Sequence, residues 1–532
     1  MFFVLVSLWF FRAIKYVLFW LYLWQLKEYH IGRFLDHFST YKGKKLVSNP
    51  LQGFKILLVV VFLFSQDLFA WLLFSVYLAE SFLFLKAIFQ RRVKKPVITF
   101  KTAFLLLILL FVTFLFPIFL SFSTQNEAVF YFWLLVFDIL MPVVVSAVVL
   151  LFQPFTVFSR NKTLAKAKKK MESFPNLIVI AVTGSYGKTT TKEILSTILS
   201  KNFNVLKTKE HQNSEMGIAG CILKDLKPEH EVFVVEMGAY KKGGIKMLAD
   251  IVKPRIGIIT GVNEQHLSLF KSMDNLLSAE GGVELIKALP KDGLIVFNGD
   301  NKYCLDLYRK TNIKKNIYAE KRDKIDTDVW AEDVAAEKDS ISFLAMQKNM
   351  EAVPFKVNVL GRQNIQNILG AVLVARRMGM NLQDIAEAAK NIKQEQGGMV
   401  LKQGKHGINI IDSTYSANPD GVKADLEYLK IFNKKKVIVM PSLIELGGKS
   451  KELHEKIGKT IARVCDMAII TTKDRFEDIK KGAIEGGMKK ANVMFCDNPA
   501  DLAMTISLFC TSGDAVLLEG RIPAEVIKLL SE

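Results

Sequence analysis

The chain has little cysteine, and the spacing of what it has excludes one class of site. Its 532 residues include only five cysteines, Cys221, Cys304, Cys465, Cys496 and Cys510. No two of them form a CxxC pair, and none clusters with histidine. This pattern excludes a zinc site and is typical of reduced thiols in a cytosolic domain.

Acidic residues are also few beside the basic ones. The sequence has 52 Asp and Glu against 71 Lys and Arg, which gives a formal net charge of +19. Such a balance indicates nucleic acid, anionic lipid or an acidic substrate. No basic-aromatic nucleic-acid motif is present, and many Lys and Arg lie just beside apolar segments. We therefore expect membrane lipids as a partner and no nucleic acid.

Apolar residues make up 50% of the sequence, which excludes a disordered chain, and they crowd into the first 155 positions. They form four blocks, at residues 2–26, 54–90, 104–122 and 129–152. A membrane crossing needs roughly 20 apolar residues, so we read block 54–90 as a hairpin of two helices that turns near residues 65–67. The sequence therefore predicts a membrane domain over residues 1–155 with about five transmembrane helices. A cleaved signal peptide is a poor interpretation of the first block, because no small-residue cleavage site follows it.

The loops between these blocks predict the topology. Segments 27–45, 91–101 and 160–170 are basic, whereas segment 123–128 has no basic residue. By the positive-inside rule the three basic segments are cytoplasmic, so everything after residue 155 lies in the cytoplasm, where ATP is found. The lysine run at 160–170 is either a solvated linker or a contact with anionic head groups.

Two charged residues, Arg12 and Lys15, lie inside the first apolar block. Their spacing puts them on one face of a helix, and each costs a few kcal/mol to place in a membrane. One interpretation is that both side chains reach toward the membrane interface. The other is a polar groove for a lipid-linked phosphate.

The segment "NLIVIAVTGSYGKTTTKEILSTIL" predicts an apolar strand, a glycine-containing turn and an amphipathic helix. Such a turn directs backbone N–H groups and a helix N-terminus at phosphate. Lys188 would reach the β- and γ-phosphates of ATP, and the Thr189 hydroxyl would bind Mg²⁺. The general GxxxxGK[ST] pattern fails because Val182 occupies the first glycine position. The loop residues we expect to bind ATP are Thr183, Gly184, Ser185, Tyr186, Gly187, Lys188, Thr189 and Thr190.

Two further polar residues follow predicted strands. Glu236 ends the strand "VFVVE", and His266 follows the strand "IGIITGV". Ligands collect at the carboxyl ends of parallel strands, so we expect both side chains to converge near the phosphates. Taken alone, Glu236 could be a strand-end cap and His266 a packed histidine.

These motifs together resemble the Mur ligase family, the ATP-dependent amide ligases that build the peptide of peptidoglycan. The resemblance runs from about Asn176 to the C-terminus and includes "HQNSEMGIAG" and "VVEMGAY". It implies a multi-domain protein, in which the α-helical transmembrane domain precedes an α/β P-loop central domain at 156–395 and an α/β Rossmann-like domain at 396–532. It also implies catalytic roles for Lys188, Glu236 and His266, with Mg²⁺ bound by Thr189, Glu236 and His266.

The resemblance extends to the adenine side and to the C-terminal domain. Asn298 in "GLIVFNGDN" and Asn364 in "LGRQNIQNILGA" match adenine-side motifs, although Gln363 replaces the usual histidine. The segment "DSTYSANP" matches through Asp412 and Tyr415, which would close on the nucleotide. By resemblance, these four residues complete the ATP contacts.

One branch of the family fits better than the others. The segment "SLIELGGKSKELH" resembles the MurF type, which adds D-alanyl-D-alanine, and no Asp-Asn-Pro-Arg signature of another branch is present. Three features depart from the branch: Pro441-Ser442 replace Gly-Asp, Glu519 replaces a lysine, and the membrane block stands where the UDP-binding domain is expected. The segment "LWQLKEYHIGRF" resembles membrane-anchored Mur ligases.

The implied reaction joins a dipeptide such as D-Ala-D-Ala to a muramoyl-peptide carboxylate through an acyl phosphate, with ATP converted to ADP. The precursor is either nucleotide-linked or lipid-linked, and other wall-synthesis enzymes are candidate partners. The implied location is the bacterial cytoplasmic membrane, multi-pass, with cytoplasmic catalytic domains. Two alternatives stay open: a ligase for another wall acceptor or amino acid, and a catalytically weakened ATP-binding scaffold.

Many Mur ligases bind a second magnesium through a lysine carboxylated by CO₂. Aligning "SAEGGVELIKALP" on Glu284 and Leu289-Pro290 puts Gly282 at the lysine position. On a helix, Glu280 would lie off that face. We therefore expect the second magnesium to be held by His266 and Glu236 with water. The other two possibilities are a replacement by Glu280 and reduced activity.

Overall fold

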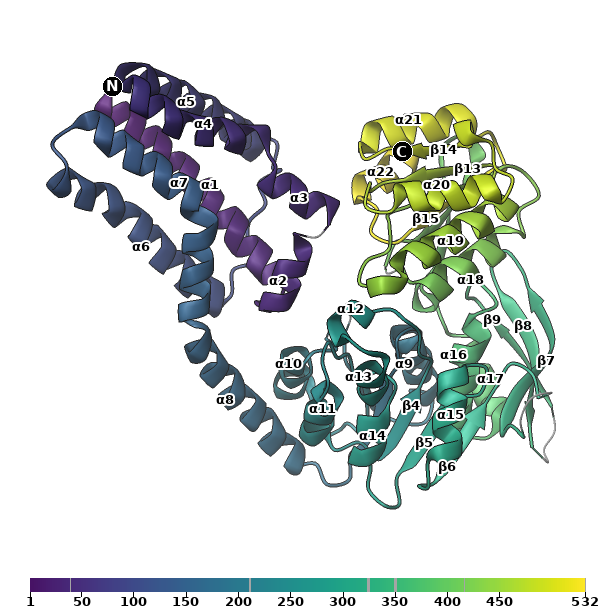
Figure 1. The fold of residues 1–532 in the computed structure, drawn as a ribbon. Helices are drawn as coiled ribbons and strands as arrows, with labels where there is room; N and C mark the ends of the chain where they lie inside the picture. Colours follow the sequence, from purple (N-terminus) through teal and green to yellow (C-terminus); the bar gives the residue numbers. More distant parts are fainter. Residues whose placement is uncertain (39, 210–211, 323–325, 349–351, 416, 532) are drawn as a thin grey trace. The chain divides into compact units, whose positions relative to one another are not determined.

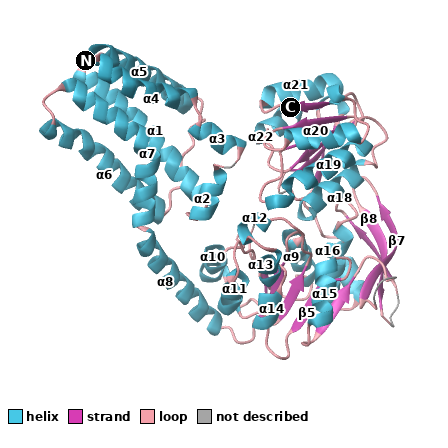
Figure 2. Cartoon of the chain, in the orientation of Figure 1, coloured by secondary structure: helices cyan, strands magenta, loops and turns pink. Residues whose placement is uncertain are grey.

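The computed structural model describes residues 1–532 except 39, 210–211, 323–325, 349–351, 416 and 532 (Figure 1). The chain divides into two units, Met1–Asn161 and Lys162–Glu532. The first is helical, and the second combines helices with strands (Figure 2). Helix α8, Gln153–Glu172, runs across the boundary between them.

The first unit consists of long apolar helices joined by short segments. Five helices of the described residues are long and apolar enough to cross a membrane, which confirms the predicted number. The predicted hairpin is also present, because α4 ends at Phe64 and α5 begins at Gln66. The Ser65 hydroxyl caps α5 by accepting a hydrogen bond from the Leu68 amide at 3.3 Å. The helices are α1 Phe2–Leu26, α2 Ile31–His37, α3 Tyr41–Val47, α4 Pro50–Phe64, α5 Gln66–Phe89, α6 Phe100–Ser123 and α7 Glu127–Leu151.

Four charged side chains are buried together inside this unit. Arg12 of α1, Lys55 of α4, Glu80 of α5 and Asp138 of α7 are all 7% exposed or less. The Lys55 ammonium donates to Glu80 at 2.6 Å and to Asp138 at 3.0 Å, and the Arg12 guanidinium pairs with the same two carboxylates. We call these four residues the ion network. Arg12 therefore neither reaches toward an interface nor lines a groove, and both interpretations made from the sequence are wrong for this residue.

The second unit begins with a nine-stranded sheet in the order β2-β3-β1-β4-β5-β6-β7-β8-β9. Strands β2 through β7 pair in parallel, and β8 and β9 extend the sheet antiparallel. The strands are β1 Ile178–Thr183, β2 Val205–Lys207, β3 Val232–Glu236, β4 Ile256–Ile259, β5 Leu294–Asn298, β6 Lys315–Tyr318, β7 Val329–Ala336, β8 Ile341–Gln347 and β9 Val353–Val357.

Helices cover both faces of this sheet, as a buried parallel sheet requires. Helices α9 Lys188–Leu199, α16 Asn364–Arg377 and α17 Leu382–Ala389 pack on one face. The other face is covered by α10 Glu215–Asp225, α11 Gly244–Val252, α13 Met273–Ser278, α14 Val283–Ala288 and α15 Lys302–Lys310. The short helix α12, Leu267–Phe270, follows His266. The carboxyl ends of β1, β3 and β4 therefore lie at one edge of a rigid layered core.

A six-stranded sheet follows, in the order β10-β11-β15-β12-β13-β14. All its pairs are parallel except β10 with β11. Its strands are β10 Val400–Gln403, β11 Asn409–Ser413, β12 Lys436–Met440, β13 Met467–Ile470, β14 Val493–Phe495 and β15 Ala515–Glu519, and its helices are α18 Pro419–Leu429, α19 Ser450–Val464, α20 Phe476–Glu485, α21 Pro499–Phe509 and α22 Ala524–Ser531. The predicted fold class, apolar helices followed by two α/β sheets, is confirmed.

Glu519, one of the three departures noted in the sequence, ends β15 and is fully buried. Its carboxyl faces that of Asp425, which accepts hydrogen bonds from the Ser413 hydroxyl and from the Gln363 amide. Burial, and next the charge of Asp425, raise the pKa of Glu519 well above its usual range. The residue is thus part of the C-terminal core, where burial beside Asp425 favours the protonated form of its carboxyl.

Candidate active site

The turn after β1 requires glycine at two positions. Gly184 has a φ of +142°, and a Cβ atom there would lie 2.3 Å from the Thr260 hydroxyl oxygen. Gly187 has a φ of +75°, and its Cβ would lie 2.6 Å from the Asn367 side-chain oxygen. Gly187 is also the N-cap of α9, so Lys188 and Thr189 form the first turn of that helix. The local structure is the strand, loop and helix N-terminus expected of a phosphate-binding loop.

A threonine that the sequence reasoning missed holds this loop. The Thr260 hydroxyl contacts the carbonyl oxygens of Thr183, at 3.1 Å, and of Tyr186. The Ser185 amide donates to the Gly261 carbonyl at 2.7 Å. Thr260 directly follows β4, so the rule that ligands collect at the carboxyl ends of strands could have identified it.

The Tyr186 side chain contacts the turn between β5 and α15. Its hydroxyl accepts a hydrogen bond from the Asn301 amide at 3.1 Å, and burial raises its pKa. Asn301 was also missed from the sequence, and its side chain caps α15 by accepting from the Tyr303 and Cys304 amides.

The Lys188 ammonium folds over the loop. It donates to the Gly184 carbonyl at 2.5 Å and to the Ser185 carbonyl at 3.4 Å, and it lies 4.0 Å from a Glu280 oxygen. Its side chain is 11% exposed, so its charge is largely withdrawn from solvent. The arrangement places one cation directly above the loop.

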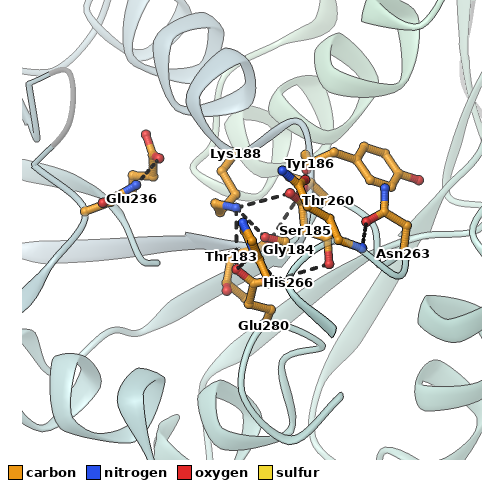
Figure 3. Close-up of polar contacts among 12 residues, drawn as sticks. Thr183, Gly184, Ser185, Tyr186, Lys188, Glu236, Thr260, Asn263, His266 and Glu280 are labelled. Carbon is orange, nitrogen blue, oxygen red and sulfur yellow. Dashed lines mark hydrogen bonds and ion pairs between the residues drawn. The ribbon is translucent and has the colours of Figure 1, made fainter. Parts of the chain in front are cut away.

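His266 lies beside this cation in company with Glu280 (Figure 3). Its Nδ1 atom is 3.2 and 3.3 Å from the two Glu280 oxygens, and its Nε2 atom is 3.6 Å from Glu445. The Ser185 hydroxyl donates to Glu280 at 3.3 Å. We call Ser185, Lys188, His266 and Glu280 the loop cluster.

The position of Glu280 corrects an expectation from the sequence. Helix α13 ends at Ser278, and the Gly281 amide turns back to bond the Leu276 carbonyl at 3.0 Å. The prediction that Glu280 points off the site assumed a continuous helix and was wrong for that reason. At Gly282 a Cβ would instead meet Ile259 at 2.2 Å, inside the core. The Glu280 carboxylate therefore lies beside His266, which corrects the expectation that it points away from the site.

Glu236 lies apart from the loop cluster (Figure 3). Its carboxylate accepts a hydrogen bond from the Asn213 amide at 3.0 Å and lies 3.4 Å from the buried Lys192 ammonium. The structure thus does not bring Glu236 to His266. Nor does any group of three His, Cys, Asp or Glu side chains in the described part of the chain form a preassembled metal site. The metal roles of Thr189, Glu236 and His266 stay predictions.

The two asparagines expected near adenine are buried, and their side-chain amides donate hydrogen bonds to other protein groups. The Asn298 amide donates to the Thr260 carbonyl at 2.8 Å and to Gln366 at 3.1 Å. The Asn364 amide donates to the carbonyls of Leu360 and Gly397 at 2.8 and 2.9 Å. These bonds tie the strand end and the start of α16 to the loop region, and contact with adenine stays a prediction.

The C-terminal part of the unit meets the loop region through residues other than those expected. Asp412 pairs with Lys402 at 2.6 Å, and Tyr415 is 44% exposed. The cross-contacts come instead from Asn418 and Asp420, which accept from the Asn263 amide at 3.1 and 2.9 Å. The Glu445 carboxylate adds its contact with His266, and the Glu445 backbone carbonyl accepts from the Ser268 amide at 3.2 Å. His211, in the predicted Asn-rich segment, lies outside the described residues.

Known proteins match this second unit. Residues 182–375 match the Mur ligase middle domain, and residues 398–522 match the Mur ligase, glutamate ligase domain. The UDP-N-acetylmuramoyl-tripeptide–D-alanyl-D-alanine ligase of Bacillus subtilis is 27% identical over 360 residues, which cover 66% of this chain and 76% of that one.

Solved structures agree with the sequence matches. MurF from Acinetobacter baumannii superposes with a TM-score of 0.62 at 26% identity, covering 70% of this chain and 80% of that one. MurF from Thermotoga maritima in complex with ADP gives 0.60 at 26% identity, covering 70% and 83%. Neither domain match extends into the helical first unit. The chain therefore belongs to the Mur ligase family of ATP-dependent peptide ligases.

Proposed function

We propose that this protein is an ADP-forming ligase of the MurF type, which joins a dipeptide such as D-Ala-D-Ala to the carboxylate of a muramoyl peptide. The observation that carries the proposal is the loop cluster, in which Lys188 and His266 both lie by Glu280 next to a phosphate-binding loop. The relatives named above, which carry that activity in their names, support the choice of substrate class.

The chemistry requires positioning rather than a side-chain nucleophile. The acceptor carboxylate attacks the γ-phosphorus of ATP and forms an acyl phosphate, and ADP leaves. The dipeptide amine then attacks the acyl carbon, and the tetrahedral intermediate expels phosphate. Lys188 and the backbone N–H groups of the loop hold the phosphates in line and offset their charge. Magnesium, when bound, supplies the remaining positive charge at the phosphates.

Thr189 and His266 are the side chains that would hold the cation, whereas Glu236, the third residue that the resemblance implies, contacts Lys192 and Asn213 in this structure. The donor set fits a magnesium–phosphate complex, because among the described residues the buried Glu280 carboxylate has only Lys188, at 4.0 Å, as a permanent cation nearby. Asn298 and Asn364, whose hydrogen bonds to the protein fix their positions, would line the part of the site that binds adenine. Asp412 and Tyr415 would reach the nucleotide only after a movement of the C-terminal part, which Asn418 and Glu445 already connect to the loop region.

We further propose that the acceptor is presented at the cytoplasmic face of a bacterial membrane, with the first unit as a multi-pass anchor. Its five candidate spans and the basic segments between them support this location. The family domains leave the helical first unit unmatched, and as an anchor that unit would hold the enzyme at the membrane. A lipid-linked muramoyl peptide lies in that membrane and therefore suits such an enzyme. Other wall-synthesis enzymes in the same membrane are then candidate partners.

The test uses the full-length protein in lipid nanodiscs with ATP, isotope-labelled D-Ala-D-Ala and either a UDP-linked or a lipid-linked muramoyl tripeptide. We expect an amide product with the lipid-linked acceptor, identified by mass. A product only from the UDP-linked acceptor would keep the ligase and overturn the lipid-linked substrate. ATP hydrolysis without any amide product would overturn the ligase and favour a scaffold.

A further inference from the structure

Glu280 is the acidic side chain of the loop cluster, and the reaction described above does not yet assign it a direct contact with a ligand. We propose that its carboxylate is a direct ligand of a divalent cation, held jointly with His266 and the ATP phosphates. This inference rests on the proposed function and names a metal-binding residue for the same site.

The local chain geometry aims Glu280 at the loop. Helix α13 ends two residues earlier, and the Gly282 amide bonds the Ala279 carbonyl at 2.9 Å, closing a tight turn around Glu280. A Cβ on Gly281 would lie 2.5 Å from the Leu277 backbone, so this turn needs glycine. The turn directs the side chain inward, where only 1% of its surface is exposed.

The charges around Glu280 are incomplete once ATP is considered. A buried carboxylate is costly unless a cation or several hydrogen bonds compensate it. Here it has the Ser185 hydroxyl, His266 and the Lys188 ammonium at 4.0 Å. If Lys188 turns to the phosphates, as the proposed function requires, the carboxylate loses its nearest permanent cation. A divalent cation arriving with ATP would replace it.

Glu236 does not offer the same opportunity. Its carboxylate lies 3.4 Å from the buried Lys192 ammonium and accepts from the Asn213 amide, and it is not in contact with His266. Magnesium is commonly bound by one or two carboxylates together with substrate phosphates and water. One carboxylate and one imidazole beside the loop suit that arrangement, even though no three-residue group is preassembled among the described residues.

The test measures cation binding rather than turnover. The full-length protein is titrated with Mn²⁺ in the presence of a non-hydrolysable ATP analogue, and bound Mn²⁺ is followed by electron paramagnetic resonance. In the presence of the analogue, we expect Glu280→Gln to lower the affinity for Mn²⁺ by about tenfold or more. Bicarbonate-free buffer should leave the wild-type protein unchanged, because this carboxylate belongs to the chain itself.

Glu284→Gln is the matched control. Glu284 lies on the next helix and is 7% exposed, but its carboxylate accepts from the Gly243 and Lys246 amides at 2.7 and 3.0 Å, away from the loop. That variant should bind Mn²⁺ as the wild type does. Equal Mn²⁺ affinity in Glu280→Gln and wild type would overturn the proposal while leaving the ligase intact. Failure of the wild type to bind the analogue at all would instead overturn the proposed function.

If Glu280→Gln does not fold, the wild type provides a second measurement. An anomalous-scattering map of the Mn²⁺–analogue complex should show a Mn²⁺ peak within about 2.2 Å of a Glu280 oxygen. Peaks only at Thr189 and the phosphates would overturn the assignment.

Discussion

The ion network of the first unit and the loop cluster of the second are both buried and charged, but they are balanced differently. In the ion network two cations face two carboxylates, and each cation touches both carboxylates. In the loop cluster Lys188 lies 4.0 Å from the only carboxylate and gives its hydrogen bonds to backbone carbonyls. The first cluster is complete in itself, whereas the second has a cation that can turn toward a ligand.

This difference separates a structural role from a binding role. A complete buried network ties four helices to one another, and no site for a further ion follows from it. A cluster whose charges are only loosely paired can exchange partners when an anion arrives. Each of the following predictions tests one side of this comparison.

The largest effect is expected in the ion network. Lys55→Met leaves two carboxylates facing a single cation, and removing one partner of a buried pair costs about 3–5 kcal/mol. The measurement is the free energy of unfolding of the full chain in mixed micelles. The double variant Lys55→Met with Asp138→Leu restores the balance and should recover most of the loss; an equal or larger loss would show that the network is not a self-contained unit.

A smaller effect is expected in the loop cluster, on turnover. Lys188→Ala removes the cation above the loop, and a lost charged contact costs about 1.5–3 kcal/mol or more, which is about tenfold to over a hundredfold in rate. ADP release measures it. Lys201→Ala is the control, because this partly exposed lysine just beyond α9 pairs with Asp384 far from the loop. Undiminished turnover in Lys188→Ala would contradict the assignment of this loop as the ATP-binding site.

The buried pair of Glu519 and Asp425 adds a pH dependence to stability. The folded-state pKa of Glu519 is raised above its unfolded value of about 4.3, so between these two pKa values folding takes up a proton. In that range each unit of rising pH lowers the free energy of unfolding by about 1.4 kcal/mol. Glu519→Gln removes this cost. Its β15 amides should exchange more slowly than those of the wild type at neutral pH, with the gap closing toward pH about 4.

Hydrogen exchange at several pH values measures that gap. Glu525→Gln, at an exposed position on α22, should show no such difference. A wild type that is as stable as Glu519→Gln at every pH would show that Glu519 is not held protonated.

The smallest effect is expected at an exposed ion pair. The Lys449 ammonium lies 2.9 Å from the Glu264 carboxylate, and their side chains are 50% and 21% exposed. Glu264 follows a strand of the nine-stranded sheet, and Lys449 follows a strand of the six-stranded sheet. Exposed pairs contribute about 0.2–1 kcal/mol, so Lys449→Ala should change the KM for ATP by only a few fold. Steady-state kinetics at low and high salt measure it, and a change of a hundredfold would mean that this pair holds the two sheets together.

Much of this architecture could be predicted from the sequence because local signals determine it. The apolar runs and the polar break at Ser65 gave the five helices, and the glycine pattern around Lys188 gave the loop. The strand-end rule also predicted that His266 lies by the loop, where it contacts Glu280. Such features depend on a few neighbouring residues, which a sequence displays directly.

The rest depends on partners that are distant in sequence. Arg12 was misread because Lys55, Glu80 and Asp138 come from three other helices, and nothing in their spacing shows that they meet. Glu280 was misread because a helix was assumed where two glycines make a turn. Glu236 does lie at the carboxyl end of its strand, as predicted, but it contacts Lys192, one turn into α9, rather than His266.

The central claim is that ATP is used to activate the acceptor carboxylate. The most direct measurement gives the full-length protein an acceptor whose reacting carboxylate carries heavy oxygen, and follows that label by mass spectrometry of the released phosphate. An acyl phosphate passes one carboxylate oxygen to the phosphate, so we predict one heavy oxygen in each phosphate released with an amide product. Amide product accompanied by unlabelled phosphate would contradict the account.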